Sequence, residues 1–373
     1  MRLHLAWRYR SLMSELNKLD PEHHRLTGFQ GLGLGAKPLS VIYGAFIRLR
    51  GLLYDLGILR VRSSPLFTIS VGGLEVGGVG KTPVVAYLLR KLLKEGSHPA
   101  LLSRGYGRET KDLVLRLPGD PVDPAKHGDE PAMVVASGLD IPLGICGDRS
   151  RAARVVAAGS RSDVLVMDDG FAHRRLARHL DLVVLRGEAP LGNSQLLPSG
   201  TLREPPGSLN RAHLLWFHSK SGEFNEDDIA AALRCAPGAG ELRSVSGILS
   251  ASSTRFENLK LAGKKIVAVV GIARPGDFID SLKSLGADIC ELKIFPDHHR
   301  YTRRDRVTIG ECMIKQNADY VVTTSKDYVK LQPFWGTGDL VQLIYGIKLV
   351  KGEKALAESL NKGGGAETSR MTA

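Results

Sequence analysis

A glycine-rich segment, residues 66–82, carries the residue types that bind the phosphates of a nucleotide. It reads LFTISVGGLEVGGVGKT, a strand-forming run that leads into a glycine-rich turn. In such a loop the backbone N–H groups and the next helix N-terminus bind phosphate oxygens, the lysine neutralises the β and γ charges, and the threonine hydroxyl ligates Mg²⁺. The segment therefore predicts a site for a nucleotide and Mg²⁺, with Gly77, Gly78, Gly80, Lys81 and Thr82 as ligands.

One position of this loop departs from the GxxxxGK[ST] pattern. That spacing places a glycine at position 75, where this chain has Glu75, so the three glycines that follow must form the turn. Glycine lets the backbone approach a phosphate closely. A carboxylate near the loop is expected to weaken nucleotide affinity unless it points away or pairs with a basic side chain.

A second apolar run ends in two carboxylates. Residues 163–170 read DVLVMDDG, which predicts a strand followed by Asp168 and Asp169. A phosphate loop needs such carboxylates to hold Mg²⁺, so we expect both beside Thr82. Taken alone, an Asp-Asp pair also fits a loop or a helix cap, but the glycine-rich loop upstream favours the metal site.

Three further polar clusters follow short apolar runs. They are SRGYGR at 103–108, GDE at 128–130 and GDR at 147–149. Their arginines suit an anionic substrate, because the guanidinium group binds phosphate through paired hydrogen bonds.

The elements that must position these residues alternate along the chain. Strand-like runs at 66–71, 100–103, 163–167 and 181–185 are interleaved with helical stretches such as 82–95. Alternating strands and helices predict a mostly parallel sheet with helices on both faces. The fold class expected is therefore an α/β fold of the P-loop NTPase type, with a smaller C-terminal α/β domain and an N-terminal amphipathic helix.

Changes in composition suggest where the domains divide. Between 237 and 264 Gly, Ser and Ala dominate, and a second β/α series begins at 265. The expected ranges are an N-terminal extension (1–36), an amphipathic membrane-associating helix (37–62), a P-loop kinase domain (63–240), a linker (241–264), a C-terminal α/β domain (265–361) and a disordered tail (362–373).

The helix near the N-terminus has one apolar face in a basic setting. Ile42, Phe46, Leu49, Leu53 and Leu56 recur at spacings of four and three, and Lys and Arg outnumber Asp and Glu by ten to four over residues 1–62. Such a helix suits an anionic bilayer surface. Packing on its own domain is the alternative. The GxGxG string at residues 31–35 has no strand before it, so we interpret it as a flexible linker.

Composition narrows the class of protein. Basic residues exceed acidic ones by 51 to 39 over 373 residues, giving +12 and favouring polyanionic partners. Only 6% of residues are aromatic and no nucleic-acid module is recognised, so we expect no nucleic acid among the partners. Four widely spaced cysteines signal neither a zinc site nor a disulfide framework, and no apolar run is long enough to span a membrane.

Eight motifs in order resemble the tetraacyldisaccharide 4′-kinases of lipid A biosynthesis, from residue 38 to about 331. They are VGGLEVGGVGKTP, LSRGYGR, GDEP, DDGFAHRRL, LPSGTLREP, GIARPGDF, FPDHHRYT and TTSKDYVKL. The resemblance implies transfer of the ATP γ-phosphate to the 4′-hydroxyl of tetraacyldisaccharide 1-phosphate. It also implies peripheral attachment at the cytoplasmic face of the bacterial inner membrane. We expect a monomer. The first 14 residues are poor in acidic side chains but lack serine enrichment, so organelle targeting is less favoured.

The resemblance also implies roles for individual residues. Asp129 of GDEP is the implied catalytic base and His298 of FPDHHRYT its partner, with His299 as a substitute. A base shared between domains would act only when the cleft closes. The implied contacts to substrate or nucleotide phosphates are Arg104, Tyr106, Arg149, His173, Arg203 and Glu204.

The chain departs from the family pattern at four positions. Gly73, Glu75, Ala172 and Ser325 stand where the family usually has Asn, Ser or Thr, Gln, and Glu. The main alternative function is a membrane-associated P-loop ATPase switch without lipid phosphotransfer, similar to the ParA and MinD family. That family carries a signature lysine where this chain has Val76. A DHH phosphoesterase is disfavoured, because no other Asp-rich motif accompanies the string and the P-loop would be unexplained.

Overall fold

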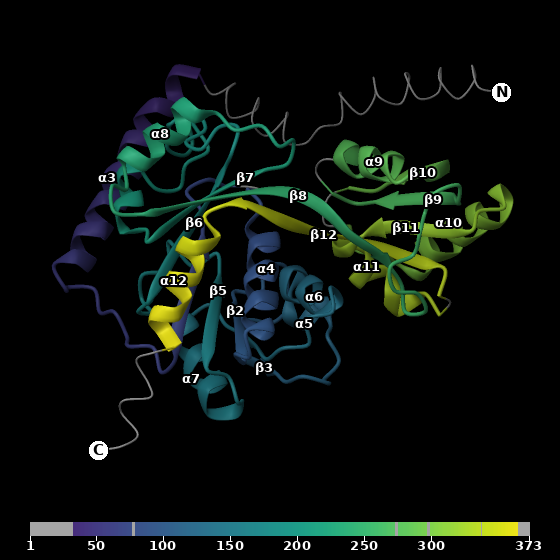
Figure 1. The fold of residues 1–373 in the computed structure, drawn as a ribbon, viewed down its shortest axis with the longest axis horizontal. Coiled ribbons are helices and arrows are strands. Elements are labelled where there is room, and N and C mark those ends of the chain that lie inside the picture. Colours follow the sequence, from purple (N-terminus) through teal and green to yellow (C-terminus); the bar gives the residue numbers. More distant parts are fainter. Residues whose placement is uncertain (1–32, 77–78, 273–274, 297–298, 337, 365–373) are drawn as a thin grey trace. The chain divides into compact units, whose positions relative to one another are not determined.

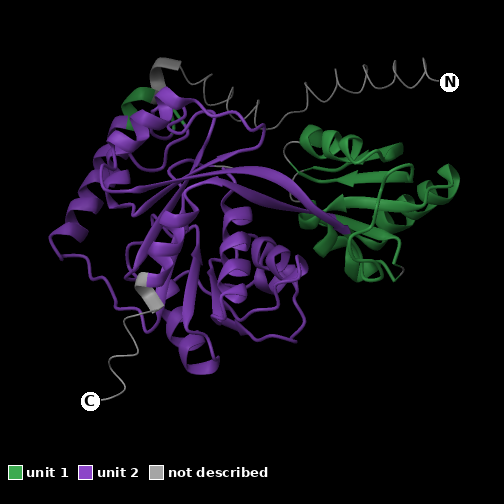
Figure 2. Ribbon diagram, in the orientation of Figure 1, with its two compact units in different colours: residues 1–40, 198–200, 252–342 green, residues 41–197, 201–251, 343–373 purple. Residues whose placement is uncertain are grey.

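The computed structural model describes residues 33–76, 79–272, 275–296, 299–336 and 338–364. Its contacts divide the chain into two compact units, coloured separately in Figure 2. Unit 1 comprises 1–40, 198–200 and 252–342, and unit 2 comprises 41–197, 201–251 and 343–373. Most of the residues that the sequence singles out belong to unit 2.

Unit 2 is built on a mostly parallel sheet (Figure 1). Its strands hydrogen-bond in the order β12-β8-β7-β6-β1-β5-β2-β4-β3, in which β3 runs antiparallel to β4. The strands are β1 (Phe67–Gly72), β2 (Pro99–Ser103), β3 (Val114–Arg116), β4 (Leu143–Ile145), β5 (Val164–Asp168), β6 (Leu180–Arg186), β7 (Leu214–Ser219), β8 (Gly240–Ser252) and β12 (Leu340–Lys351). Because β1 pairs in parallel with both β5 and β6, the carboxyl ends of these strands meet at one edge of the sheet.

Helices cover both faces of this sheet, because successive strand side chains point to opposite sides. In β6, Leu182 and Val184 join one buried cluster with α4 and α12, whereas Val183 and Leu185 join another with α8. A third cluster packs α7 on β2 and β5. The helices are α4 (Lys81–Lys94), α5 (Pro124–His127), α6 (Asp129–Ala136), α7 (Arg149–Gly159), α8 (Glu226–Arg234) and α12 (Glu353–Gly364), with a 3₁₀ turn η1 at Pro206–Arg211.

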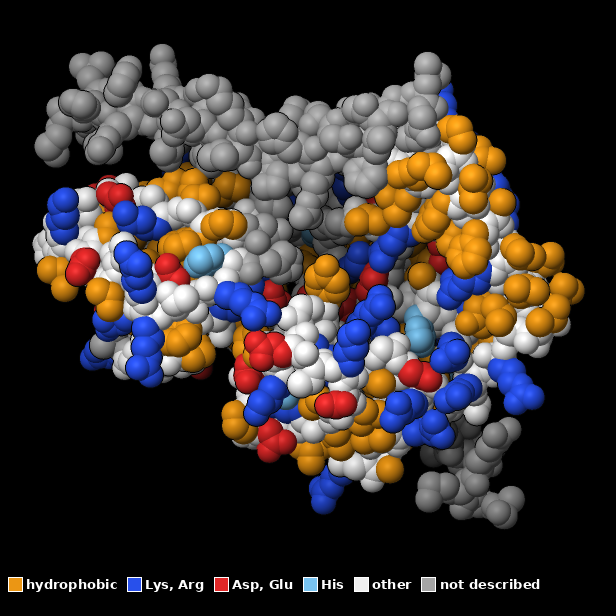
Figure 3. Space-filling view, turned by 180° about the vertical axis from the view of Figure 1, so that it is seen from behind, with side chains coloured by type: hydrophobic (Ala, Val, Ile, Leu, Met, Phe, Trp, Pro, Cys, Tyr) orange, Lys and Arg blue, Asp and Glu red, His pale blue; other side chains and the backbone are white. Residues whose placement is uncertain are grey.

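Helix α3 (Gly33–Asp55) leaves a row of apolar side chains in solvent. Leu39, Ile42, Phe46, Leu49 and Leu52 are all more than half exposed. Figure 3 shows hydrophobic side chains gathered over this helix at the right of the view, with Lys and Arg side chains beside them. Within the described residues, none of the helices combines the length and the apolar character needed to cross a bilayer.

Unit 1 is a second, smaller α/β layer. Strands β10 (Asp288–Ile294), β9 (Lys265–Val270), β11 (Tyr320–Thr324) and the start of β12 lie in that order, and β9 is parallel to both β10 and β11. Its helices are α9 (Pro275–Ser284), α10 (Arg303–Gln316) and α11 (Ser325–Leu331), with a 3₁₀ turn η2 at Gln332–Phe334. Val267, Val269 and Val321 pack with Ile309 of α10 and Leu331 of α11 in its core.

The structure differs from the expected domain ranges at two segments. The segment 241–264, expected as a linker, holds most of β8, which is buried at Leu242, Ser244 and Ala251, is half-exposed or exposed elsewhere, and has no long apolar run. Helix α12, which the sequence assigned to the C-terminal domain, packs in unit 2 through Leu356 and Leu360. Residues 1–32 of the extension and 365–373 of the tail lie outside the described residues.

Candidate active site

The turn between β1 and α4 requires glycine where it meets the helix. Gly80 has φ +86°, a left-handed conformation that side chains disfavour, and a Cβ there would lie 2.3 Å from Cδ2 of His218. Lys81 and Thr82 follow as the first two residues of α4. The N–H groups of this first turn have no partner within the helix, so the turn can bind an anion. Gly77 and Gly78 lie outside the described residues.

The His218 side chain packs against Gly80 of this turn, a contact that was not expected from the sequence. The side chain is 4% exposed at the end of β7, and its two ring nitrogens lie 2.9 Å from the hydroxyls of Ser244 and Ser246 on β8. Burial, and to a lesser degree the charge of Lys220, lowers the pKa of His218 to about 4. The imidazole is therefore neutral at pH 7. Its signal in the sequence is a histidine inside the otherwise apolar strand LLWFHS.

Asp168 lies buried at the carboxyl end of β5, opposite Val71 of β1. It is 3% exposed, and burial together with the negative charges of Glu130 and Asp169 raises its pKa to about 7. The nearby positive charges are too few to balance the negative charges of Asp168, Glu130 and Asp169. A cation placed beside it would restore the balance.

Asp169 connects two basic side chains of the site. Its φ of +48° turns the chain at the strand end, and its two oxygens each accept a 2.8 Å hydrogen bond from the guanidinium of Arg203. Lys81 Nζ lies 3.4 Å from Oδ1 of the same carboxylate. Burial alone would raise the pKa of Asp169, but Arg203 and Lys81 outweigh it and hold the pKa well below its usual range. Asp169 thus fixes the positions of the phosphate-loop lysine and of Arg203.

Further cations and a neutral histidine surround Asp168 and Asp169, which we call the acidic pair. Arg149 is 5% exposed, and burial, then the nearby charge of Arg104, lowers its pKa, although Asp168 and Asp169 partly oppose this. Burial and the charge of Arg149 lower the pKa of His173 to about 4. Arg149 Nε and His173 Nε2 are buried without a hydrogen-bond partner in the described part of the chain. Polar groups left unpaired in this way indicate a binding site for a ligand.

The loops SRGYGR and GDEP pack against each other through glycines. Gly128 has φ +91°, and a Cβ there would lie 2.8 Å from Cα of Gly105. Gly128 is also the N-cap of α6, so Asp129 is the first residue of that helix. This contact brings Asp129 close to the segment that carries Arg104 and Tyr106. The Tyr106 side chain is 69% exposed.

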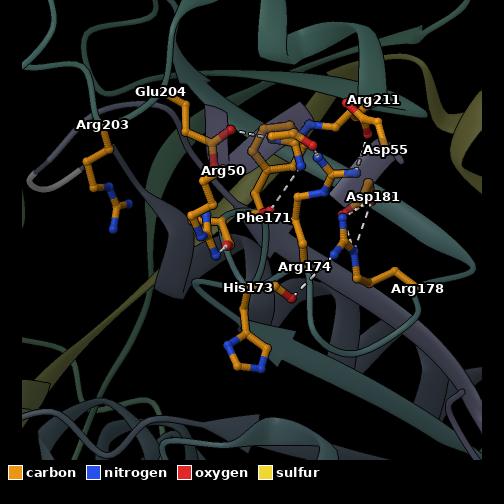
Figure 4. Close-up of polar contacts among 12 residues, drawn as sticks. Arg50, Asp55, Phe171, His173, Arg174, Arg178, Asp181, Arg203, Glu204 and Arg211 are labelled. Carbon is orange, nitrogen blue, oxygen red and sulfur yellow. Dashed lines mark hydrogen bonds and ion pairs between the residues drawn. The ribbon is translucent and has the colours of Figure 1, made fainter. Parts of the chain in front are cut away.

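Glu204 belongs to a network that joins the site to α3. It is 6% exposed and pairs with Arg211, while its Oε1 has no hydrogen-bond partner among the described atoms. Figure 4 shows this pair beside the loop 171–174, in which Arg174 pairs with Asp55 of α3 at 2.6 Å. Arg50 of α3 donates a 2.9 Å hydrogen bond to the Ala172 carbonyl. These contacts connect the loop 171–174 to α3.

The Glu75 carboxylate is paired with a basic side chain. Its carboxylate is 3% exposed and accepts hydrogen bonds from Arg186 at 2.8 and 2.9 Å and from the Thr201 hydroxyl at 2.7 Å. The backbone of Val76 donates to the Thr201 carbonyl at 2.9 Å. This residue replaces the expected glycine and joins the phosphate loop to the segment LPSGTLREP. The negative charge of Glu75, which the sequence places near the phosphate loop, is therefore neutralised by the guanidinium of Arg186.

Removing this guanidinium should destabilise the fold. We expect Arg186→Met to lower the free energy of unfolding by about 2 kcal/mol, because it leaves the buried Glu75 charge without its counterion, while solvent at Arg186 screens part of the loss. Urea unfolding measures the effect. Adding Glu75→Gln to Arg186→Met should recover part of the stability, and equal losses in the single and double variants would contradict the pairing.

The histidines of FPDHHRYT belong to unit 1. His298 lies outside the described residues. His299 Nε2 lies 3.2 Å from Asp305 Oδ2, and the imidazole stacks on Phe295 with ring centroids 4.7 Å apart. His299 thus packs within unit 1, and the roles expected for His298 and for His299 as its substitute stay predictions.

The fold and the site of unit 2 define a class: a P-loop phosphotransferase, in which a phosphate-loop lysine lies beside carboxylates at the end of a neighbouring parallel strand. Comparison with known proteins narrows this class. The family model described as tetraacyldisaccharide-1-P 4′-kinase (LpxK) matches residues 34–363.

Similar proteins agree with this match. The tetraacyldisaccharide 4′-kinase of Anaeromyxobacter dehalogenans is 36% identical over 330 residues, which are 85% of this chain and 87% of the relative. The enzyme of the same name from Syntrophus aciditrophicus is 38% identical, over 79% of this chain and 83% of its own. The crystal structure of LpxK from Aquifex aeolicus in complex with ATP has a TM-score of 0.73 at 28% identity, covering 90% of this chain and 98% of that one. This chain belongs to the tetraacyldisaccharide 4′-kinase family.

The comparisons confirm the resemblance, the α/β fold class and the kinase activity expected from the sequence. The individual site residues stay predictions. The geometry brings together Lys81, Asp169 and Arg203 by direct contact, and Asp168, Glu130, Arg149, Arg104 and His173 by electrostatic interaction.

Proposed function

We propose that this chain transfers the γ-phosphate of ATP to the 4′-hydroxyl of a tetraacyldisaccharide 1-phosphate. The observation that carries the proposal is the Asp169 carboxylate, which holds both Lys81 and Arg203 beside the buried Asp168. Two cations fixed in this way can stabilise the charge that develops on the equatorial oxygens of a transferring phosphoryl group. Because these side chains are already positioned, little reorganisation accompanies the reaction.

The residues present fit a magnesium ion. Asp168 is buried beside two other carboxylates, and its raised pKa reflects a shortage of positive charge that a divalent ion would relieve. Within the described residues no three His, Cys, Asp or Glu side chains form a metal cage, in keeping with an ion that takes its other ligands from phosphates and water. Asp168, Thr82 and Asp169 would hold Mg²⁺, which neutralises phosphate charge when bound.

Asp129 is proposed to accept the proton of the attacking hydroxyl. It begins α6, and the loop contact through Gly105 brings it to the segment of Arg104. His298 would assist from unit 1. Arg104, Tyr106, Arg149, His173 and Glu204 would contact the phosphates or the sugar.

We further propose that α3 attaches the enzyme to the anionic cytoplasmic face of the inner membrane, where its lipid substrate resides. The exposed apolar row on α3, in a basic setting, supports this attachment. Ile42 and Phe46 are 65% and 62% exposed and would enter the lipid interface.

Polar substitution on this row should release the enzyme from membranes. We expect Ile42→Ser with Phe46→Ser to lower the partition onto phosphatidylglycerol vesicles at least about 10-fold, since each side chain gains roughly 1.5–3 kcal/mol from burial. Co-sedimentation measures the partition. Leu93→Ser, an exposed leucine on α4, is the matched control. Equal binding by all three proteins would exclude α3 as the attachment site.

The alternative is a nucleotide switch that hydrolyses ATP without a lipid acceptor. Incubation of the purified protein with Mg²⁺, γ-labelled ATP and tetraacyldisaccharide 1-phosphate, followed by thin-layer chromatography, distinguishes the two. Label in the lipid is the expected result. Label released only as inorganic phosphate would overturn the proposed function and favour the switch.

A further inference from the structure

A cleft lies between the end of α3 and the loop that follows the acidic pair. A cavity of about 640 Å³ is lined by residues that include Tyr54, Arg60, Arg62 and Arg175. A second cavity of about 310 Å³ shares Tyr54 and Arg175 and extends to His173. We call the two together the arginine cleft. All of its residues belong to unit 2.

The arginine cleft carries more positive charge than its own side chains neutralise. Arg62 and Arg175 share one carboxylate, Asp148, at 3.7 and 3.3 Å, and both side chains are about half exposed. Arg60 has no hydrogen-bond or ion-pair partner within the described ranges of the chain. A guanidinium that is both exposed and unpaired binds phosphate oxygens readily.

Apolar side chains border the charged ones. Leu56, Ile58 and Val61 are 63%, 63% and 49% exposed, and they continue the apolar row of α3 along the chain. Figure 3 shows this juxtaposition of hydrophobic and basic side chains at the right of the view. The surface therefore suits an amphiphile with a phosphate next to acyl chains, rather than a free anion alone.

The inner end of the arginine cleft reaches the proposed active site. His173, which lines the second cavity, follows Asp169 by four residues, and its Nε2 is buried without a partner among the described residues. Gly147 and Asp148, also in the lining, immediately precede Arg149. A ligand extending inward from the cleft would meet Arg149 and the acidic pair.

We propose that the arginine cleft binds the phosphate that the acyl disaccharide already carries at its 1-position, through Arg60, Arg62 and Arg175. This inference rests on the proposed function. The reacting hydroxyl lies at the opposite end of the disaccharide, so an anchored 1-phosphate directs that hydroxyl toward the acidic pair. The arginines thereby select a lipid that is already phosphorylated at one end.

The test compares two acceptors, tetraacyldisaccharide 1-phosphate and the same disaccharide without its phosphate. For Arg60→Gln with Arg175→Gln we expect the KM for the phosphorylated acceptor to rise at least about 10-fold, as two charge-assisted hydrogen bonds are lost, with kcat within about 3-fold of wild type. The KM for the unphosphorylated acceptor should not change. Arg161→Gln, an exposed arginine just beyond the C-terminus of α7, is the matched control.

Four results would overturn the inference. An unchanged KM, or an equal rise for both acceptors, removes the 1-phosphate as the ligand. A comparable loss of binding to phosphatidylglycerol vesicles without acceptor assigns the arginines to bulk lipid headgroups. The single variant Arg60→Gln, at a side chain without partners in the described structure, repeats the test with no contact removed. Absence of transfer by the wild-type enzyme to either acceptor would refute the proposed function itself, and the inference with it.

Discussion

Replacing Lys81 with methionine is expected to lower kcat for phosphotransfer about 10³-fold, equivalent to about 4 kcal/mol of transition-state stabilisation. Lys81 begins α4, and its ammonium group lies 3.4 Å from Asp169 with the side chain 15% exposed. Methionine keeps the length and the apolar part of the side chain but removes the charge. The transferring phosphoryl group would then lose a cation that is held in place before the reaction.

Stability should change little in this variant, because Asp169 keeps both hydrogen bonds from Arg203 and is not left unpaired. Steady-state assays with labelled ATP measure kcat, and thermal unfolding checks the fold. Lys94→Met, in the last turn of the same helix, is the control and should retain full activity. A Lys81→Met enzyme with kcat within about 10-fold of wild type would refute the role of this lysine.

Asp129→Asn has the second large expected effect, a fall in kcat of about 10²–10⁴-fold, the usual contribution of a positioned general base. Asparagine has nearly the same shape and still suits the start of α6, so packing should be preserved. The amide cannot accept a proton from the attacking hydroxyl. Because the substitution leaves the phosphate loop intact, the Kd for ATP should stay within about 3-fold of wild type.

Single-turnover measurements with the lipid acceptor separate this chemical step from binding. Asp112→Asn, at an exposed aspartate of unit 2, controls for the lost charge and should behave like wild type. If Asp129→Asn instead raises the Kd for ATP and leaves the single-turnover rate unchanged, Asp129 binds nucleotide and another group accepts the proton.

Much of the fold follows from local signals in the sequence. The β1 strand, the glycine turn and α4 were expected from a strand-forming run, a glycine-rich segment and a helix start, and these features act over short distances. β8 was not expected. Its Ser and Gly residues carry little apolar signal, and its pairing with β7 and β12 makes it a strand.

The site was predictable where residues act through their type and spacing. Lys81 and Asp168 lie in motifs whose chemistry is local, and parallel pairing of β1 with β5 brings the motifs together. The Glu75–Arg186 pair and the contact of His218 with Gly80 were not predictable, because they join residues more than 100 positions apart. Side chains that support a loop from another strand leave no spacing pattern.

The most direct test of the central claim is the position of the new phosphate. Product made by the wild-type enzyme from ATP and tetraacyldisaccharide 1-phosphate can be examined by ³¹P NMR with proton correlation. We expect a second phosphomonoester, coupled to the proton at the 4′-carbon, and no such signal with Lys81→Met. A phosphate attached elsewhere on the lipid, or a product spectrum identical to that of the substrate while ATP is consumed, would contradict the claim.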